Sequence, residues 1–275
     1  MRYLLNFADE KYRRAQQVNT WTSKYIAGFD RVIEFSPDSI DADFRSEHNR
    51  IFKYKRGSGL WIWKPYLISK MLEQVEEGDI VFYLDSGAFW VKCAKPIFRI
   101  IEKENYYISV VPLKEKQFTK RNVFTELNCM GDCYLNTNQV QSTMLGFKKT
   151  TGTVLFVKEW LKLCENIELL APDLIPDGVD ESFYAHREDQ SLLSLLCKKR
   201  EIPVHLDPTQ YGRLPEKYAR DGVDIVTYWN NKEYSPMIAL HRSGNLSFRT
   251  CLNQVFGCFL PRKVSLWLIH KKGGC

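Results

Sequence analysis

Residues 56–90 read RGSGLWIWKPYLISKMLEQVEEGDIVFYLDSGAFW, and this stretch decides the fold class. The run from Ile80 to Leu84 has no polar position, so both faces of a strand there should be buried, as in the centre of an α/β sheet. Asp85 follows at the carboxyl end of that strand, and Ser86 and Gly87 allow a sharp turn. Ligands of open α/β sheets bind at this edge, where a carboxylate can hold a divalent cation and, through it, phosphate.

The rest of the chain alternates strands and helices, which predicts an α/β fold with a mostly parallel central sheet and helices on both faces. The expected strands are 3–7, 31–35, 80–84, 107–112 and 142–147. The expected helices are 10–26, 44–55, 65–75, 154–164 and 181–199. No repeat or low-complexity linker interrupts the 275 residues. We therefore expect a single domain over residues 1–245, followed by a basic amphipathic segment over 246–275.

Composition is that of a soluble globular protein, with 44% hydrophobic and 26% charged residues. No run approaches the roughly eighteen apolar residues that cross a bilayer, and from the strand-like residues after Met1 we expect no signal peptide. The eight cysteines are scattered without paired zinc spacing, so we expect free thiols and a cytoplasmic location. The net charge of +6 suits an acidic partner, or serves solubility alone.

The segment from Phe248 to Gly274 mixes large apolar residues with five Arg and Lys residues and contains no Asp or Glu. Such a segment can lie on an anionic membrane surface, which would make the protein peripheral to a membrane and bring it to a lipid-linked acceptor. It can equally form a last helix that packs on the core and leaves its lysines in solvent. The sequence leaves both options open.

The tryptophan-containing turn and Asp85-Ser86-Gly87 resemble the sugar-donor site of GT-A-type glycosyltransferases, especially those that build bacterial capsule and lipopolysaccharide chains. Three other segments resemble this family in the same order. Residues 2–40 resemble the first strand, helix and second strand of its Rossmann-like nucleotide-binding half. FTKRNVFTEL (118–127) and QSTMLGFKK (141–149) resemble the middle of the fold, where the acceptor half begins. HREDQSLLSLL (186–196) resembles the late Asp-Gln helix that carries catalytic residues.

The resemblance implies a donor site on the first half of the chain. Lys64, fixed between Trp63 and Pro65 before a helix, is placed to contact phosphate, although it could also be a solvated cation, as could Arg56. The expected donor-binding residues are Phe7, Asp9, Arg56, Lys64, Asp85, Ser86, Lys120 and Arg121. Mn²⁺ or Mg²⁺ is the expected cofactor, with Asp85 and the late His241 as its ligands. Asp-Ser-Gly supplies one carboxylate where many relatives have Asp-x-Asp.

The second expected group of site residues is His186-Arg187-Glu188-Asp189-Gln190-Ser191. In the similar lipopolysaccharide galactosyltransferases an Asp-Gln pair here meets the acceptor and the reacting carbon. This implies Asp189 and Gln190 as catalytic residues, with His186 and Gln141 in contact with the acceptor. An inverting enzyme would use Asp189 as general base. A retaining enzyme would use the pair to stabilise an oxocarbenium-like transition state, and the sequence does not decide between the two.

The sequence thus predicts a glycosyltransferase, either a hexosyl- or a pentosyltransferase, that uses a nucleotide sugar, UDP- or GDP-linked. Its acceptor would be a glycan hydroxyl, in surface polysaccharide or glycoprotein glycan synthesis, and no nucleic-acid partner is expected. Two alternatives stay open: a non-catalytic glycan- or nucleic-acid-binding protein, and another nucleotide-dependent transferase. The chain contains no Walker-type phosphate loop, which disfavours the second alternative.

Overall fold

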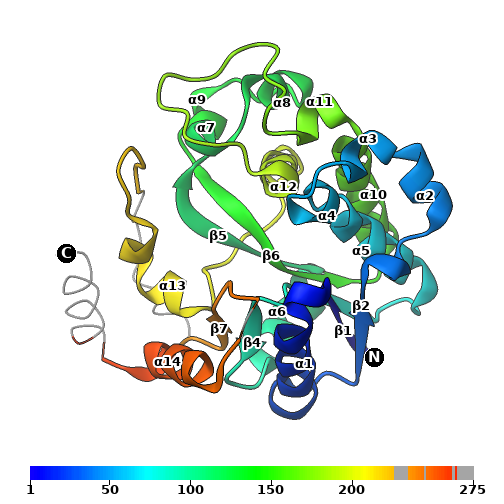
Figure 1. Cartoon of the computed structure of the whole chain (residues 1–275), viewed down its shortest axis with the longest axis vertical. Coiled ribbons are helices and arrows are strands. Elements are labelled where there is room, and N and C mark those ends of the chain that lie inside the picture. Colours follow the sequence, from blue (N-terminus) through cyan, green and yellow to red (C-terminus); the bar gives the residue numbers. More distant parts are fainter. Residues whose placement is uncertain (226–234, 245, 262–263, 265–275) are drawn as a thin grey trace.

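The computed structural model describes residues 1–225, 235–244, 246–261 and 264 (Figure 1). A five-stranded sheet in the order β2-β1-β3-β6-β5 forms its centre. The strands are β1 (Arg2–Phe7), β2 (Arg31–Phe35), β3 (Ile80–Leu84), β5 (Tyr106–Lys114) and β6 (Asn138–Lys148). Strands β2, β1 and β3 pair in parallel, whereas β6 runs antiparallel to both β3 and β5. Only β6 opposes the other four, so the prediction of a mostly parallel α/β sheet is confirmed.

A second, two-stranded sheet joins β4 (Ala88–Trp90) to β7 (Ile238–Leu240) in antiparallel pairing. Strand β4 begins three residues after Asp85, so this small sheet continues from the end of β3. It brings the late residues around Arg242 beside the end of β3, because the backbone N–H groups of His241 and Arg242 donate to Gly87 O at 2.8 and 3.0 Å.

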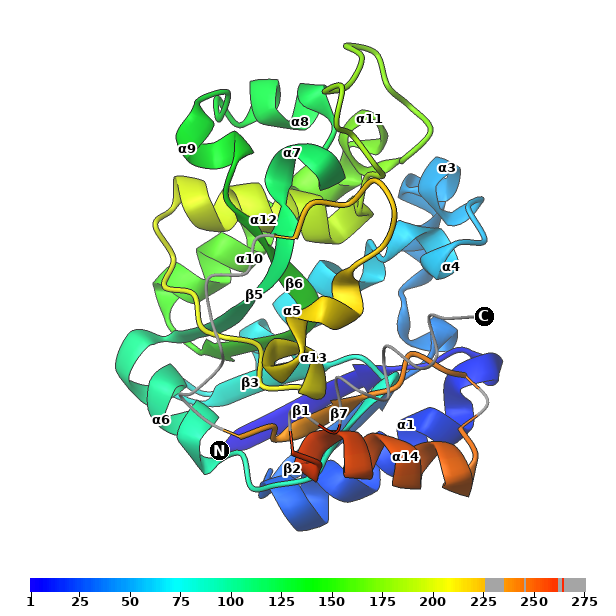
Figure 2. The ribbon, with the colours of Figure 1, turned by 90° about the vertical axis from the view of Figure 1, so that its left-hand side faces the viewer.

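Strand β3 is buried on both faces, as its apolar run predicted. Val81 and Tyr83 pack in the core cluster that contains α5 (Trp63–Gln74), α10 (Thr151–Glu165) and α12 (Glu188–Lys199). Ile80, Phe82 and Leu84 pack in the cluster that contains α6 (Lys95–Glu104) and the small sheet. Figure 2 shows helices above and below the sheet. The expectation of helices on both faces is therefore confirmed, and a polar residue within β3 would disrupt one of the two cores.

The remaining helices are short, apart from α1 and α14. They are η1 (Glu10–Tyr12), α1 (Arg13–Thr22), the π-helix η2 (Ser23–Ala27), η3 (Pro37–Ser39), α2 (Ala42–Glu47), α3 (Asn49–Phe52), α4 (Gly57–Leu60), α7 (Glu115–Phe118), α8 (Arg121–Glu126), α9 (Asp132–Leu135), α11 (Ile167–Leu170), α13 (Gln210–Arg213), η4 (Pro215–Tyr218) and α14 (Phe248–Phe259). The predicted strands 31–35 and 80–84 have the observed bounds. The predicted helix over 44–55 is divided, because His48 leaves the helical conformation between α2 and α3.

The predicted helix over 181–199 was wrong in its first third, since α12 begins only at Glu188. The backbone N–H groups of Tyr184 and Ala185 donate to Gln117 O at 2.8 and 3.2 Å, so the chain before α12 is tied to the end of α7. These amides are then not available for a helical turn. His186 consequently does not share a helix face with Asp189.

The C-terminal segment contains α14, which buries Cys258 against Phe89 and Ala239 of the small sheet. Lys271 and Lys272, together with Arg262 and Lys263, lie outside the described residues. No helix in the described ranges is long and apolar enough to cross a membrane. The cysteines at the described positions are all free thiols, as predicted.

Candidate functional site

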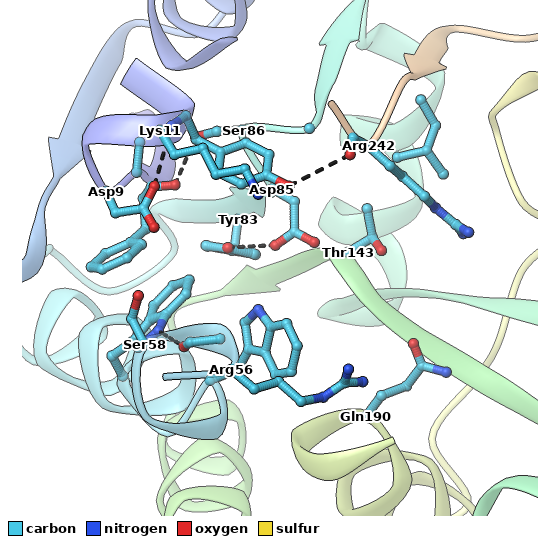
Figure 3. A pocket seen from close by; sticks show the side chains of 18 of the residues that line it. Asp9, Lys11, Arg56, Ser58, Tyr83, Asp85, Ser86, Thr143, Gln190 and Arg242 are labelled. Carbon is cyan, nitrogen blue, oxygen red and sulfur yellow. Dashed lines mark hydrogen bonds between the residues drawn. The ribbon is translucent and has the colours of Figure 1, made fainter. Parts of the chain in front are cut away.

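A cavity of about 530 Å³ opens at the carboxyl ends of β1 and β3. One part of its wall comes from the end of β1 and the residues after it, from the segment 55–63 and from residues 83–87. The other part comes from Thr143 of β6, from Arg187 and Gln190 at the start of α12, from Leu240 at the end of β7 and from Arg242 after it. Figure 3 shows Asp85 within this cavity. The volume lies in the range of small-molecule sites, and the position is the sheet edge at which the sequence predicted a ligand.

Asp85 is held at the end of β3 by contacts to its neighbours on both sides. Its backbone N–H donates to Thr143 O of β6 at 2.8 Å, and its Oδ1 accepts from the hydroxyl of Tyr83 at 2.5 Å. The next residue, Ser86, donates from Oγ to Phe7 O at 2.7 Å and so ties the end of β3 to the end of β1. The Asp85 side chain remains 32% exposed, and its carboxylate can meet a ligand in the cavity.

The tryptophan turn, residues 56–63, forms the opposite wall. Five successive residues from Gly57 to Trp61 have positive φ angles, between 50° and 97°. Left-handed backbone costs a residue with a side chain about 1–2 kcal/mol, and such strain clusters at functional sites. A Cβ on Gly57 would lie 2.4 Å from the Trp61 ring, so glycine is needed for Trp61 to lie against the turn and line the cavity.

The two tryptophans have different surroundings. Trp63 is 4% exposed, stacks on Phe7 with ring centroids 3.7 Å apart, and donates from Nε1 to Gly57 O, so it is mainly a core residue. Trp61 lies under the guanidinium of Arg56, whose Cζ is 5.4 Å from the ring centre. The Nε of Arg56 also lies 2.6 Å from Glu188 Oε1 of α12. Arg56 is thereby fixed on the cavity wall from two sides.

Lys64 does not line the cavity, contrary to the sequence prediction of a direct phosphate contact. Its side chain is 2% exposed, and its Nζ lies 3.3 Å from an oxygen of Asp85 and 3.3 Å from an oxygen of Asp189. It also donates to the backbone oxygen and the hydroxyl of Ser142 at 3.1 and 3.2 Å. Burial alone would lower the pKa of Lys64, but the two carboxylates outweigh it and raise that pKa. Lys64 is thus a charged bridge between β3 and α12, just behind the cavity wall.

Of the two predicted catalytic residues, Gln190 lines the cavity and Asp189 lies behind its wall. Gln190 lines the cavity and donates from Nε2 to Gln139 Oε1 at 2.9 Å. Asp189 is 3% exposed and does not line it. Burial raises the pKa of Asp189, with Lys64 as the main opposing influence. In this arrangement Asp189 has no surface for an acceptor hydroxyl, and its partner is Lys64.

Four other predicted site residues lie away from this cavity. Lys120 is buried and donates to the carbonyl oxygens of Glu168, Ala171 and Leu174 at 2.8, 2.5 and 2.8 Å. Burial lowers its pKa to about 8. The other three are Arg121, exposed at the start of α8; Gln141, which donates to Ser109 Oγ at 2.9 Å; and His186, whose ring is buried. Burial lowers the pKa of His186 well below its usual range. These positions follow from loop and helix packing that the sequence pattern did not reveal.

Phe7 and Asp9, which the sequence predicts to bind the donor, line the cavity, and so do several residues to which the sequence does not point. The added ones are Lys11, Tyr12, Lys55, Tyr83, Thr143 and Arg242, and Arg187 of the expected group 186–191 also lines the cavity. Lys11 lies two residues after Asp9, and Arg242 directly follows His241; Asp9 and His241 are both residues that the sequence predicts for the site. The carboxyl-edge rule could have found Lys11, because it follows β1 by only four residues.

The residues present do not fit the expected Mn²⁺ or Mg²⁺ site. Within the described ranges there is no group of three or more His, Cys, Asp or Glu side chains that could hold a metal ion. Asp85 already accepts from Tyr83 and lies beside the Lys64 ammonium. His241 does not line the cavity, its Nδ1 accepts from Ser243 N at 3.1 Å, and its Nε2 is buried without a hydrogen bond to any described residue. Burial lowers the pKa of His241 to about 4.

A second cavity, of about 540 Å³, adjoins the first along the same sheet edge. The two share Ala8 and Asp9, and the second extends past the end of β2, where Phe35 and Ser36 line it. Together they give a ligand an extended path across the carboxyl ends of β2, β1 and β3.

Three solved structures resemble this fold. Mouse xyloside xylosyltransferase 1, in its apo form, matches with 11% identity over 74% of this chain and 84% of its own, with a TM-score of 0.42. The galactosyltransferase LgtC, in complex with donor and acceptor sugar analogs, matches with 12% identity over 95% and 98%, with a TM-score of 0.49. GlyE of Streptococcus pneumoniae TIGR4, a glycosyltransferase in its apo form, matches with 16% identity over 99% and 64%, with a TM-score of 0.44.

All three are glycosyltransferases. At these identities and scores the likeness is one of fold and carries nothing about donor, acceptor or mechanism. No protein-family model matches this chain, and no curated protein matches it in sequence.

Proposed function

We propose that this protein transfers a sugar from a nucleoside-diphosphate sugar to a hydroxyl of a glycan. The observation that carries the proposal is the placement of Asp85. It is a partly exposed carboxylate at the end of a fully buried strand, and it faces a cavity whose walls also carry Lys and Arg side chains. Carboxylates bind sugar hydroxyls and cations bind phosphate, so one cavity offers both halves of a nucleotide sugar their partners.

The donor would lie along the carboxyl edge of the sheet. Its diphosphate would lie near Arg56 and the other cations of the first cavity, and its sugar near Asp85 and Gln190. The nucleoside would extend toward Asp9, which lines both cavities. This orientation uses the extended path past β1 and β2 and leaves the α12 side open for an acceptor.

In the transfer, the bond between the sugar's anomeric carbon and the diphosphate oxygen breaks, a bond to the acceptor oxygen forms, and the proton of the acceptor hydroxyl passes to the departing diphosphate. The departing diphosphate gains negative charge, which fixed cations stabilise without reorganising. Asp85 and Gln190 would border the reacting carbon. Asp189 would act as a positioning residue, because it holds Lys64, and Lys64 in turn holds Asp85.

We propose a UDP- or GDP-sugar as donor and a growing surface polysaccharide as acceptor. A thermal-shift screen with UDP-, GDP-, CMP- and dTDP-sugars tests the donor, since a ligand that binds only the native state raises the melting temperature. A rise with a UDP- or GDP-sugar supports the proposal, whereas a rise with a CMP-sugar alone would contradict a nucleoside-diphosphate donor. No rise with any of them, together with salt-sensitive binding of DNA or RNA, would favour a nucleic-acid-binding protein instead.

We also propose that α14 contacts an anionic membrane surface. Phe248, Leu252, Phe256 and Phe259 are 79%, 41%, 57% and 49% exposed, and the spacing of the first three places them on one helix face. The basic residues that follow in the sequence would add attraction to anionic lipid. Cosedimentation with phosphatidylglycerol vesicles tests this, with phosphatidylcholine vesicles as control. A Phe248→Ser/Phe256→Ser variant that sediments like wild type would contradict it.

A further inference from the structure

We propose that side-chain cations of this cavity hold the donor's diphosphate, and that binding needs no divalent metal. This inference rests on the proposed function and names how its anionic ligand is recognised. It departs from the expectation, drawn from the family resemblance, of Mn²⁺ or Mg²⁺ held by Asp85 and His241.

The cavity lining carries five cationic side chains and two carboxylates. The cations are Lys11, Lys55, Arg56, Arg187 and Arg242, and the carboxylates are Asp9 and Asp85. The cations come from four separate parts of the chain: η1, residues 55–56 at the beginning of the tryptophan turn, the start of α12 and the residue pair after β7. Figure 3 shows Lys11, Arg56 and Arg242 on different sides of the cavity that contains Asp85. They surround a common space and do not form one solvated face.

Most of these cations lack a carboxylate partner. Arg56 pairs with Glu188, but within the part of the chain that the structure describes no ion pair involves Lys11, Lys55, Arg187 or Arg242. Like charges that share one cavity repel each other, and an anion between them relieves that repulsion. A diphosphate supplies the negative charge that these unpaired cations lack.

Aromatic rings hold four of the five cations at the cavity, and one of these is Arg56 over Trp61. The Cζ of Arg242 lies 5.0 Å from the Tyr211 ring and 5.7 Å from the Tyr218 ring, and Lys11 Nζ lies 5.6 Å from the Tyr12 ring. Arg187 lies over Phe118 at 5.0 Å. Burial lowers the pKa of Arg187 to about 10. The positive charge of Arg242 contributes to the lowering, because the two guanidinium groups repel each other. Arg187 therefore remains charged at neutral pH, and preorganised cations lose little freedom when phosphate binds.

The same geometry disfavours a metal at Asp85. A divalent ion on its carboxylate would share it with the ammonium of Lys64, 3.3 Å from Oδ1, and with the Tyr83 hydroxyl. Two cations on one carboxylate repel each other, and the second carboxylate of an Asp-x-Asp pair is a glycine here, Gly87. In a transferase of this design, guanidinium and ammonium groups stabilise the departing diphosphate in the role that a metal would otherwise have.

The test titrates UDP, GDP, CDP and dTDP into the purified chain by calorimetry, first in EDTA and then in Mn²⁺. We expect one nucleotide to bind with the same affinity in both buffers, and Mn²⁺ alone to show no binding. Binding that appears only in Mn²⁺ would overturn the inference and leave the proposed function intact. Binding of Mn²⁺ alone that is lost in Asp85→Asn or His241→Ala would also overturn it. No binding of any nucleotide in either buffer would reject the proposed function, and the inference with it.

Variants test which cations act. Lys11→Gln and Arg242→Gln should each raise the Kd of the bound nucleotide about tenfold, because each removes a charged hydrogen-bond donor. The matched control is Lys24→Gln. Lys24 lies over Tyr25 at 5.4 Å much as Lys11 lies over Tyr12, but it lines neither cavity. Unchanged affinity in both cavity variants, with melting temperatures equal to wild type, would reject the role of these cations.

Discussion

Two buried lysines of this chain, Lys64 and Lys120, have opposite surroundings. Lys64 lies between two carboxylates, and they raise its pKa. Lys120 lies among three backbone carbonyls, one within α11 and two after it, and burial lowers its pKa to about 8. Both follow turns in the sequence and both resembled phosphate-binding lysines, yet neither reaches the cavity.

The difference separates a residue of the site from a residue of the scaffold. Carboxylate partners make Lys64 part of the electrostatics of the cavity, because Asp85 faces the cavity and Asp189 lies at the start of the helix behind it. Carbonyl partners make Lys120 a clamp on α11 and the loop after it, and Lys120 does not line the cavity. The groups around the ammonium of a buried lysine therefore indicate whether it has a functional role, whereas burial by itself does not.

The largest effect is expected from Lys64→Met. Removal of the ammonium leaves Asp189 buried without its cationic partner, so the free energy of unfolding should fall by about 3–5 kcal/mol. Urea unfolding followed by circular dichroism measures it. Lys64→Met/Asp189→Leu should recover part of the loss, because it removes the stranded charge. A Lys64→Met variant as stable as wild type would show that the ion pairs of Lys64 contribute nothing to the free energy of unfolding.

Lys120→Met should cost less, about 1–3 kcal/mol, because it leaves neutral carbonyls without a donor and strands no charge. Nucleotide binding measured on the folded variant should equal that of wild type. A loss of binding without unfolding would place Lys120 in the site after all, and the contrast between the two lysines would disappear.

Asp189→Asn keeps the shape of the buried side chain and removes one of the two charges on Lys64. We expect kcat to fall by roughly tenfold or more with a nearly unchanged KM, since Asp85 loses precise placement while the donor-binding cations remain. A rise in KM alone would indicate that Asp189 contacts the substrate directly. Steady-state kinetics on the donor identified by the thermal-shift screen separates the two outcomes.

The smallest effects are opposite pH dependences of stability. The folded pKa of Lys120 lies below its unfolded value of 10.5, so its burial penalty is present below about pH 8 and is relieved as the pH rises toward 10.5. The folded pKa of Lys64 lies above 10.5, so its stabilisation persists to that pH and is lost above it. The unfolding free energy of wild type minus that of Lys120→Met should therefore increase between pH 8 and 10. The difference between wild type and Lys64→Met should stay constant there, and equal slopes for both would contradict the assigned surroundings.

Local patterns were enough to predict the strand from Ile80 to Leu84, the position of Asp85 and the cavity edge. An unbroken apolar run with an aspartate at its end carries that information by itself. The partners of Lys64 were out of reach, because they depend on the register of β6 and on where α12 begins. The start of α12 depends in turn on backbone bonds of Tyr184 and Ala185 to Gln117, which no side-chain periodicity encodes. The left-handed conformation from Gly57 to Trp61 was partly visible in its two glycines, but not at Leu60 or Trp61.

The most direct test of the central claim is turnover of a panel of nucleotide sugars by wild type and by Asp85→Asn, followed as release of free nucleoside diphosphate. The account predicts release from one donor class, stimulated by a glycan acceptor, and a loss of roughly 100-fold or more in kcat for Asp85→Asn with an unchanged melting temperature. Release at the wild-type rate by Asp85→Asn, or no release from any donor by either protein, would contradict it.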